Sequence, residues 1–502
     1  MTTLTVFVIL YLAVSVAIGL FAARRVKTSG DYAVAGRSLP LYIVIATVFA
    51  TWFGSETVLG IPAKFVKDGL RGVIEDPFGA SMCLVLVGLF FARKLYRMNL
   101  LTIGDYYRQR YSRTVEVLVS LCIVASYLGW VSAQITALGL VFNVLSQGAV
   151  SMPVGMCIGS AIVLLYTLFG GMWSVALTDF FQMTIIVIGL LYIAYLVSGM
   201  AGGAQQVVAH AAAAGKFHIA PALTARELLA FAGALVTMMF GSIPQQDVFQ
   251  RVMSARSEGV GAAGSLSGGA LYFLFAFVPM FLAYSAYVID PKMVDALIES
   301  DAQMILPTLI LNNTPVFAQV MFFGALLSAI MSTASGTLLA PSITLTENVL
   351  REIFPMNDRQ MLLAPSITLT ENVLREIFPM NDRQMLLATR LVVVCFAVVV
   401  TIFALVSQGT PIYDMVGNAY KVTLVTAFVP LVMGLYWKGA SNQGALCAVI
   451  GGLATWLLME RFGGDSIWPP QLAGLLASFA GMLLGSLLPQ YTRATTGATV
   501  PR

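Results

Sequence analysis

Long apolar runs separated by short polar segments make up most of this chain. A helix that crosses the hydrocarbon core of a bilayer needs about 20 predominantly apolar residues. Runs of roughly this length predict thirteen spans, at residues 4–24, 40–66, 76–93, 115–146, 151–170, 173–199, 227–245, 262–288, 315–349, 388–408, 412–437, 441–460 and 470–489. We therefore expect one all-α transmembrane domain over residues 1–502.

The composition agrees with this pattern and narrows the classes of protein. Of the 502 residues, 58% are hydrophobic and only 10% are charged, whereas soluble domains carry about 25% charged residues. A polytopic membrane protein, rather than a soluble enzyme, is the class that such a balance predicts. The net charge of +4 gives no reason to expect a nucleic-acid partner, because the basic residues sort by membrane side.

The basic residues also predict an orientation. With the N-terminus outside, the segments that would face the cytoplasm hold 20 of the 28 Lys and Arg, and the outer segments hold seven. The last one, Lys421, lies within a span. Since cytoplasmic loops are enriched in Lys and Arg, we expect a cell (plasma or inner) membrane protein with its C-terminus in the cytoplasm.

The second predicted span cannot be one regular helix. Gly54, Gly60 and Pro62 weaken its hydrogen-bond ladder at membrane depth, and Glu56 and Trp52 lie beside them. Unwound backbone inside a membrane is tolerated where it lines a cavity, and its free carbonyl groups can bind a cation. Two interpretations of Glu56 stay open: a cavity residue, or a cap on the unwound segment.

The ninth predicted span is unusually rich in hydroxyl groups. Its segment 324–340 has no charge but contains five of them, on Ser328, Ser332, Thr333, Ser335 and Thr337. Single Ser or Thr residues in a membrane helix usually bond to the carbonyl four residues earlier, but five in ten residues exceed what packing requires. The pattern predicts a site for a hard cation such as Na⁺, with a polar helix–helix contact as the alternative.

Other polar residues also interrupt apolar runs. Asp179 lies inside the sixth span, where a carboxylate is costly and a functional role is the default interpretation; a bound cation is its natural partner. Trp130 and Gln134 are four residues apart and share a face of the fourth span. For Gln134, a solute contact and a helix–helix contact are equally consistent with the sequence.

Two further positions bear on a bound solute. Lys421 lies seven residues after Asp414, within the eleventh span. It predicts either a counter-charge for a solute with a negative end or a partner for an acid across the bundle. Gln245, in the segment Pro244–Asp247, is expected at the inner end of the seventh span.

A segment of 24 residues occurs twice without a substitution. LLAPSITLTENVLREIFPMNDRQM covers residues 338–361 and again 362–385. Structural repeats drift and recur at least three times, so a perfect single copy indicates a recent duplication or an artefact of sequence assembly. The hydroxyl-rich segment lies almost wholly before it.

The chain resembles the sodium/solute symporter family, which includes proline, sugar and sialic acid symporters. The resemblance is carried by the thirteen spans, by GGMWSVALTD, by the GIP after the broken span and by LLSAIMSTASGTLLAPSITLTENV, over about residues 4–490. It implies the LeuT-type fold with an inverted five-plus-five repeat. The core would cover residues 40–437, with one peripheral helix before it (4–24) and two after it (441–489).

The resemblance also implies site residues. The family's principal sodium site falls on the carbonyl groups of Ala50, Phe53 and Ala329 and on the hydroxyl groups of Ser332 and Thr333. The accessory cation site of some members matches Asp179, to which we add the neighbouring hydroxyl of Ser328. Choline-type members are closest in local motifs, through ATW, PFG and the Trp at position 130.

Those members enclose a quaternary ammonium with aromatic faces. Here the positions that match further aromatics are Ala80 and Gln245, and Trp52 stands where proline symporters carry an essential aspartate. We therefore expect a Na⁺-coupled symporter of a small organic solute, with amino acids, betaine-like zwitterions and carboxylates ranked above choline. The expected solute contacts are Trp52, Glu56, Trp130, Gln134, Gln245 and Lys421. Proton coupling through Asp179 and Glu56, or a sensor that does not transport, are the alternatives.

Overall fold

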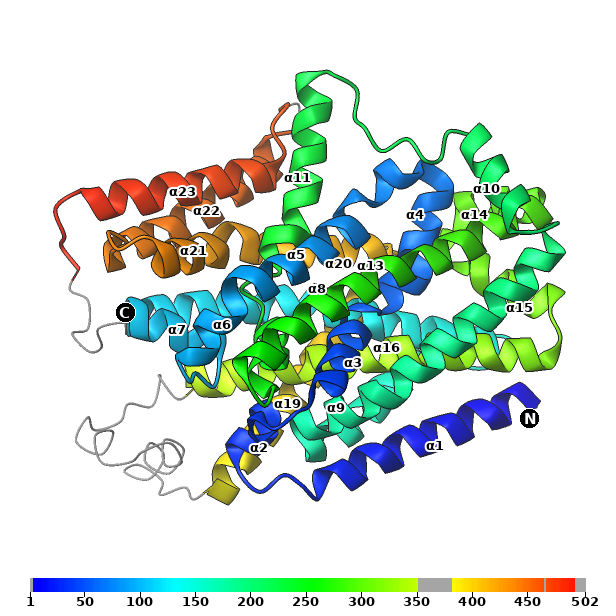
Figure 1. The fold of residues 1–502 in the computed structure, drawn as a ribbon, viewed down its shortest axis with the longest axis horizontal. Helices are drawn as coiled ribbons and strands as arrows, with labels where there is room; N and C mark the ends of the chain where they lie inside the picture. Colours follow the sequence, from blue (N-terminus) through cyan, green and yellow to red (C-terminus); the bar gives the residue numbers. More distant parts are fainter. Residues whose placement is uncertain (1–2, 351–381, 465, 493–502) are drawn as a thin grey trace.

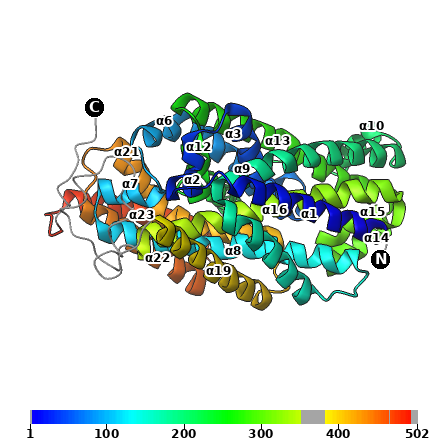
Figure 2. The same ribbon diagram turned by 90° about the horizontal axis from the view of Figure 1, so that it is seen from below.

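Long helices run along the longest axis of the molecule and pack side by side (Figures 1 and 2). The structure is a computed structural model, and it describes residues 3–350, 382–464 and 466–492. The α-helices of this part of the chain are α1 (Thr3–Ala23), α2 (Ser29–Val34), α3 (Leu41–Trp52), α4 (Ile61–Asp68), α5 (Ala80–Leu86), α6 (Ala92–Arg97), α7 (Ile103–Arg110), α8 (Arg113–Leu145), α9 (Met152–Met200), α10 (Ala204–Ala213), α11 (Ala225–Gly241), α12 (Gln246–Ser254), α13 (Glu258–Ile289), α14 (Pro291–Ser300), α15 (Ile305–Asn313), α16 (Val316–Thr344), α19 (Asp382–Val406), α20 (Ile412–Thr423), α21 (Val429–Tyr436), α22 (Asn442–Phe462) and α23 (Pro470–Leu487).

The helices of the described residues are long and apolar enough to span a membrane many times. Ten pass by length and composition, and two bent pairs raise the number to twelve. The 49 residues of α9 would extend about 74 Å, more than twice the roughly 30 Å of a hydrocarbon core. Gly171, with φ 48° and ψ −141°, interrupts α9 where the sequence predicts a boundary between two spans. The expected total of thirteen is reached only if α9 counts as two, so that total stays a prediction.

Glycine is required at this interruption of α9. A Cβ atom on residue 171 would lie 2.5 Å from the carbonyl oxygen of Tyr32, and the positive φ is one that other residues rarely adopt. The hydroxyl of Tyr32 in turn contacts the carbonyl oxygens of Thr167 and Leu168, at 3.4 and 3.3 Å. The short helix α2 thereby holds the chain reversal before the second half of α9.

Two helices are broken within the bundle. The helix α3 and the segment Glu56–Asp68, which begins with a wide π turn and continues as α4, meet at 55°, and α11 meets α12 at 44°. These are the second and seventh predicted spans, so they are five spans apart, as the first helices of two five-helix repeats would be. The break of the second span is confirmed.

The boundary predicted for the seventh span is wrong. Its chain does not end at Gln245 but bends there and continues through α12 to Ser254. Pro244 has no backbone N–H and restrains its own φ, so α11 stops at Gly241 and the helix restarts after the turn. Gln245 is therefore a residue of the bend between α11 and α12.

Backbone hydrogen bonds tie the two broken helices together at one end. The N–H of Leu39, just before α3, donates to the carbonyl of Ser254 at 2.9 Å, and the N–H of Arg256 donates to the carbonyl of Leu39 at 3.0 Å. These bonds fix the beginning of one broken helix against the end of the other.

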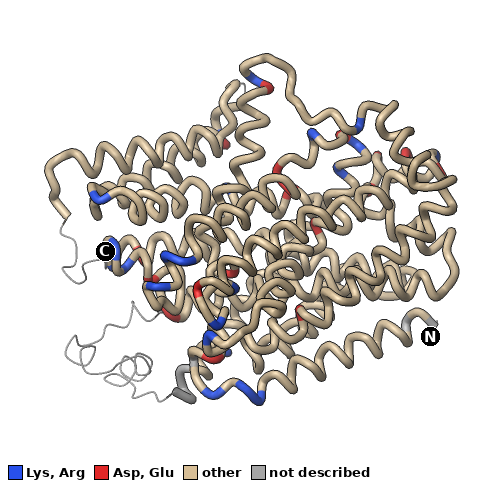
Figure 3. Tube along the Cα trace, viewed as in Figure 1, with Lys and Arg blue, Asp and Glu red and all other residues tan. Residues whose placement is uncertain are grey.

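Peripheral helices flank this core at opposite edges. Figure 1 shows α1 along one edge and the pair α22–α23 along the other. Their outward faces expose large apolar side chains, among them Phe7, Phe21, Leu457 and Leu484. In Figure 3, Lys and Arg gather toward the two ends of the long helices and leave the middle mostly uncharged. This arrangement is that of a multi-pass membrane protein.

One sequence-based assignment changes in the described part of the chain. Arg251, counted among the cytoplasmic basic residues, is only 2% exposed and lies inside the bundle. Most of the repeated segment falls outside the described residues. The part of the first copy that the structure describes completes α16 and adds a π turn at Leu345–Leu350.

Candidate functional site

The break of α3 exposes backbone carbonyl groups to the hydroxyl-rich face of α16. The chain leaves the helix at Phe53, which has φ −90° and ψ 70°. The hydroxyl of Thr333 donates to the carbonyl oxygen of Thr51 at 2.9 Å and lies 3.4 Å from that of Ala50. The sequence-based pairing of the broken span with the ninth span is thus present in the structure.

A buried carboxylate joins the same place from α9. The hydroxyl of Ser332 donates to Oδ1 of Asp179 at 2.7 Å, and the hydroxyl of Thr47 donates to Oδ2. The side chains of Asp179, Ser332 and Thr47 are fully buried. Three helices, α3, α9 and α16, therefore bring oxygen atoms together at one point inside the bundle.

This set of groups fits a hard monovalent cation. Carbonyl, hydroxyl and carboxylate oxygens are the ligands that such ions prefer, and the negative charge of Asp179 would balance the charge of the ion. Phe53 lies at the break itself, and Ala329 lies one turn before Thr333 on α16; both are fully buried. The two predicted cation sites are neighbours, because Ser332 belongs to one and bonds to the carboxylate of the other.

Ser328 does not take part in this group through any described hydrogen bond to Asp179. Its hydroxyl donates to the carbonyl of Gly324 at 2.7 Å, as a lone serine in a membrane helix usually does, and lies 2.8 Å from the hydroxyl of Tyr11 on α1. Thr47 occupies the position beside Asp179 that the sequence analysis gave to Ser328.

Arg251 connects the two broken helices. Its Nε and Nη2 donate to the hydroxyl oxygen of Thr51 at 3.1 and 2.7 Å, and its Nη1 donates to the carbonyl oxygen of Asp247 at 3.1 Å. Gly336 on α16 leaves room for the guanidinium, since a Cβ atom there would collide with Nη2. Displacing either broken helix therefore disturbs the other.

Four aromatic rings pack beside the break, on the side of Trp52. The Trp52 ring lies 5.9 Å from Trp130, 6.3 Å from Tyr272 and 6.0 Å from Tyr420 between centroids, the last pair nearly parallel at 14°. Trp130 and Tyr420 are 5.3 Å apart. We call these four residues the aromatic cluster; it joins α3, α8, α13 and α20.

Carboxylates flank the aromatic cluster. Oε1 of Glu56 accepts from the indole N–H of Trp130 at 3.2 Å, and Oε2 accepts from Nε2 of Gln134 at 2.7 Å. Oε1 of Gln134 accepts from the backbone N–H of Ser55 at 2.9 Å. Gln134 thus caps the restarted helix, while the carboxylate of Glu56, only 2% exposed, lies beside the rings.

Lys421 lies apart from this cluster. Its Nζ is 4.0 Å from Oε1 of Glu460 on α22, and its side chain is 20% exposed. Successive residues of a helix point about 100° apart, so Tyr420 faces the cluster while Lys421 faces α22. Of its two expected environments, the structure gives Lys421 an acid across the bundle.

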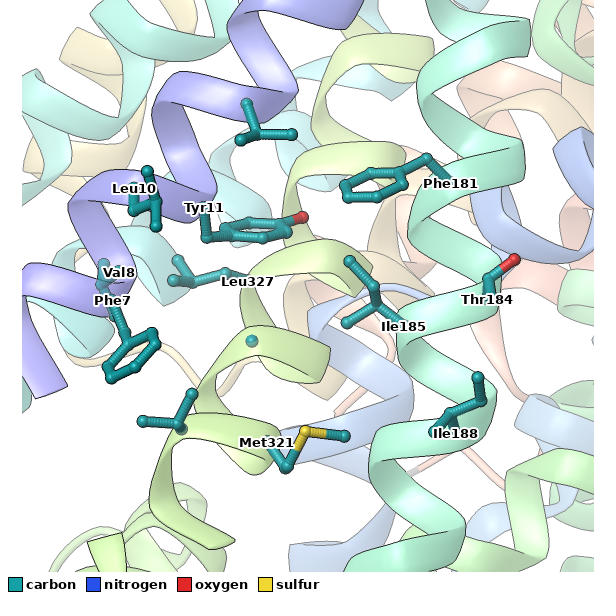
Figure 4. A pocket seen from close by; sticks show the side chains of 13 residues that line it. Phe7, Val8, Leu10, Tyr11, Phe181, Thr184, Ile185, Ile188, Met321 and Leu327 are labelled. Atoms are coloured by element: carbon teal, nitrogen blue, oxygen red, sulfur yellow. The ribbon is translucent and has the colours of Figure 1, made fainter. Parts of the chain in front are cut away.

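A cavity of about 410 Å³ lies elsewhere, between α1, α9 and α16 (Figure 4). Apolar side chains line most of it, including Leu10, Phe181, Ile185 and Met321. Its two polar side chains are engaged: the hydroxyl of Thr184 bonds to the Phe180 carbonyl, and that of Tyr11 contacts Ser328. The cavity is an apolar groove, and its lining offers no free polar group to recognise a polar solute.

Several residues of the site were not found from the sequence. They are Thr47, Asp76, Arg251, Tyr272 and Tyr420. Asp76 accepts a hydrogen bond from the hydroxyl of Tyr272. One signal was present: Arg251 follows Asp247 by four residues, which places both on one helix face. Tyr420 gave no signal of its own, because any tyrosine in an apolar run can belong to a core or to a membrane interface.

Comparisons with known proteins agree with this geometry. The human high affinity choline transporter 1 is 26% identical over 478 residues, covering 90% of this chain and 75% of that protein. The osmoregulated proline transporter OpuE of Bacillus subtilis is 24% identical over 528 residues, covering 97% and 95%. A solved structure of a Na⁺-coupled sialic acid symporter, substrate-bound and outward-open, superposes with a TM-score of 0.78 at 19% identity and covers 98% of both chains.

The fold is accordingly the LeuT type of secondary transporters. The model of the sodium:solute symporter family matches residues 32–365 and 359–452, two segments that meet inside the repeated stretch. Together they cover well over half of the chain. The chain belongs to the sodium:solute symporter family.

Proposed function

We propose that this protein couples the entry of Na⁺ to the uptake of a small organic solute. The observation that carries the proposal is the contact of the α16 hydroxyls with the broken end of α3 beside Asp179. Thr333 reaches the carbonyl of Thr51 at 2.9 Å, and Ser332 reaches the carboxylate at 2.7 Å. These groups are the donors and acceptors that a Na⁺ ion would rearrange around itself.

The same contacts suggest how the ion would act on the solute site. Ala50 and Thr51 supply the carbonyls at the end of α3. The next residue, Trp52, belongs to the aromatic cluster. An ion held between α3, α9 and α16 would fix the position of Trp52 and so favour the conformation that binds solute. A ligand shifts a conformational equilibrium only by its difference in affinity for the two states, and this arrangement gives Na⁺ such a difference.

For the solute, we propose a molecule with a cationic nitrogen. Aromatic faces attract a cation, and the carboxyl groups of Glu56 and Asp76 contact two of the four rings. The ranking of carboxylates above choline rested on the incomplete aromatic cage and on Lys421, and in the structure Lys421 lies near Glu460. Amino acids and betaine-like zwitterions stay first in the ranking of expected solutes, and simple ammonium cations now rank above carboxylates. Choline and proline, named for two relatives, both contain a cationic nitrogen.

The rings of the aromatic cluster touch one another, so a solute head could enter only when they part. Movement of α3 and α20 during alternating access would separate Trp52 from Tyr420. Transporters of this architecture bind solute at the junction of broken helices near the middle of the membrane, where this cluster lies beside the break of α3.

Proton coupling is the second candidate, because Asp179 and Glu56 are buried carboxylates. A counterflow screen in proteoliposomes separates the two. We expect exchange of labelled amino acids, betaines or ammonium compounds that requires Na⁺. Equal exchange with K⁺ replacing Na⁺, driven further by a pH gradient, would assign the protein to proton symport, and no exchange in any condition would favour a sensor.

Replacing Lys421 tests whether it sets the charge of the solute. We expect Lys421→Met to leave the order of uptake unchanged across a matched zwitterion, carboxylate and quaternary amine, because its ammonium group lies near Glu460 and not beside the rings. Uptake by the wild type and by Glu460→Gln provides the controls. Selective loss of the carboxylate-bearing solutes in Lys421→Met would return Lys421 to the solute site.

We further propose that the N-terminus lies outside and the C-terminus in the cytoplasm of the cell membrane. The support is the excess of Lys and Arg in the segments that would then face inward. Arg251 no longer counts toward that excess, since it is buried. Removing one residue from 20 leaves the bias in place.

A further inference from the structure

The bend between α11 and α12 contains buried polar atoms that have no hydrogen-bond partner among the described residues. They are Oγ of Ser242, Oε1 of Gln245 and Oδ2 of Asp247, with the hydroxyl of Tyr420 on the facing helix. None of the four side chains is more than 1% exposed. Buried polar groups are normally paired, so water molecules or a ligand would satisfy these atoms.

Asp247 and Gln245 both contact α8, and Gln245 also contacts α20. The hydroxyl of Tyr127 on α8 lies 2.5 Å from Oδ1 of Asp247, and the ring of Tyr127 stacks on Trp130 of the aromatic cluster at 6.0 Å. Nε2 of Gln245 donates to the hydroxyl of Ser126 on α8 at 2.9 Å and lies 3.3 Å from that of Thr423 on α20. The amide of Gln245 is thereby held with its nitrogen engaged and its oxygen free.

The carboxylate of Asp247 has a buried cation nearby but makes no ion pair with it. Arg251 is the basic side chain buried beside it, but its guanidinium donates to the backbone oxygen of Asp247 and to Thr51. No described ion pair includes the carboxylate of Asp247. A buried carboxylate oxygen without a hydrogen bond is costly, and a ligand that donates a hydrogen bond to it lowers that cost.

The free atoms also specify which kind of cation fits. Oδ2 of Asp247 and Oε1 of Gln245 can only accept hydrogen bonds while the aspartate is ionised. A quaternary ammonium has no N–H group and would leave both atoms unpaired, whereas a protonated primary or secondary amine donates to each. The rings of Trp130 and Tyr420 beside them attract either kind of cation. The two acceptor atoms therefore decide between an amine with N–H groups and a quaternary ammonium.

We infer that the bend of the seventh span, through Asp247 and Gln245, binds the head of a protonated amine that carries N–H donors. This inference rests on the proposed function, because it names the chemical class of the solute. It distinguishes the protein from a transporter built for a fully alkylated nitrogen, and it therefore narrows the proposed solutes to amino acids and other amines with N–H groups, without betaines or choline. Ser242 and the Tyr420 hydroxyl supply the remaining polar contacts.

Ammonium ions that carry only methyl groups test the proposed binding site for the amine head directly. Purified protein in Na⁺ would be titrated with methylammonium, dimethylammonium, trimethylammonium and tetramethylammonium chloride, and its thermal stabilisation measured. Methylammonium is expected to bind about tenfold more tightly than tetramethylammonium, since a hydrogen bond to a charged acceptor is among the stronger kinds. Asp247→Asn keeps nearly the same side-chain size. It should weaken the binding of methylammonium by about tenfold and remove most of the preference for methylammonium over tetramethylammonium.

Asp295→Asn, an exposed position on α14, is the matched control and should behave as wild type. Tetramethylammonium binding as tightly as methylammonium to the wild type would overturn the inference, as would stabilisation by none of the four amines. An amine order that is the same in Asp247→Asn and wild type would also overturn it. Stabilisation by Na⁺ alone, measured in the same protein, reports separately on the cation site, so failure of the amine assignment leaves Na⁺ coupling standing.

Discussion

Loss of either hydroxyl at the break of α3, in Ser332→Ala or Thr333→Ala, is expected to raise the Na⁺ concentration for half-maximal uptake by about tenfold or more. Each substitution removes one oxygen from a site with few ligands. Thr333 also loses its hydrogen bond to the Thr51 carbonyl, and Ser332 its bond to Asp179. The loss should appear in Na⁺ affinity first, because both side chains are small and their removal leaves the packing of α16 almost unchanged.

Ser342→Ala is the matched control for these two variants. Its hydroxyl is equally buried on α16 but bonds to the carbonyl of Leu338 at 2.7 Å, within its own helix. Na⁺ titrations of solute uptake in proteoliposomes, at equal amounts of reconstituted protein, give the comparison. If all three variants retained the wild-type Na⁺ dependence, the hydroxyls of Ser332 and Thr333 would be a polar helix–helix contact and not a cation site.

Neutralising Asp179 is expected to change the number of Na⁺ ions transported with each solute, or to weaken Na⁺ dependence by about tenfold. Asp179→Asn keeps the shape of the side chain but removes the charge that would balance an ion. Its amide also cannot accept from both Thr47 and Ser332, so a loss of hydrogen bonding accompanies the loss of charge.

Thr47→Ala separates these two effects. It removes one hydrogen bond to Asp179 and leaves the charge in place. Measured Na⁺-to-solute ratios should be normal in Thr47→Ala and altered in Asp179→Asn if the carboxylate binds an ion. Equal, mild effects in the two variants would show that Asp179 only accepts hydrogen bonds.

The sequence predicted the site where chemistry and spacing were both unusual. Gly and Pro in the middle of a predicted span indicate a broken helix. Five hydroxyl groups in an uncharged run are more than helix packing requires. Asp179 stood out because carboxylates are rare within spans. In the structure, Ser332, Thr333 and Asp179 do lie together.

Contacts between distant helices could not be predicted in the same way. The charge of Lys421 led to its interpretation as a solute contact, yet it is the neighbouring residue Tyr420 that faces the aromatic cluster. One residue turns a helix by about 100°, and an apolar run on a helix buried on most sides does not reveal which face points inward. Arg251 was assigned to a loop because the bend at Pro244 looked like the end of a span. A bent helix and a helix end share the same local sequence signals.

The central claim is that Na⁺ and solute move together. Driving Na⁺ entry with a solute gradient tests this claim most directly. Proteoliposomes would hold equal Na⁺ on both sides, and an inward gradient of a transported solute would be applied while ²²Na⁺ entry is followed. Coupling in one direction requires coupling in the other, so the solute gradient should accumulate ²²Na⁺ above equilibrium in wild type and much less in Asp179→Asn. Solute entry that leaves ²²Na⁺ at its equilibrium level would contradict sodium symport.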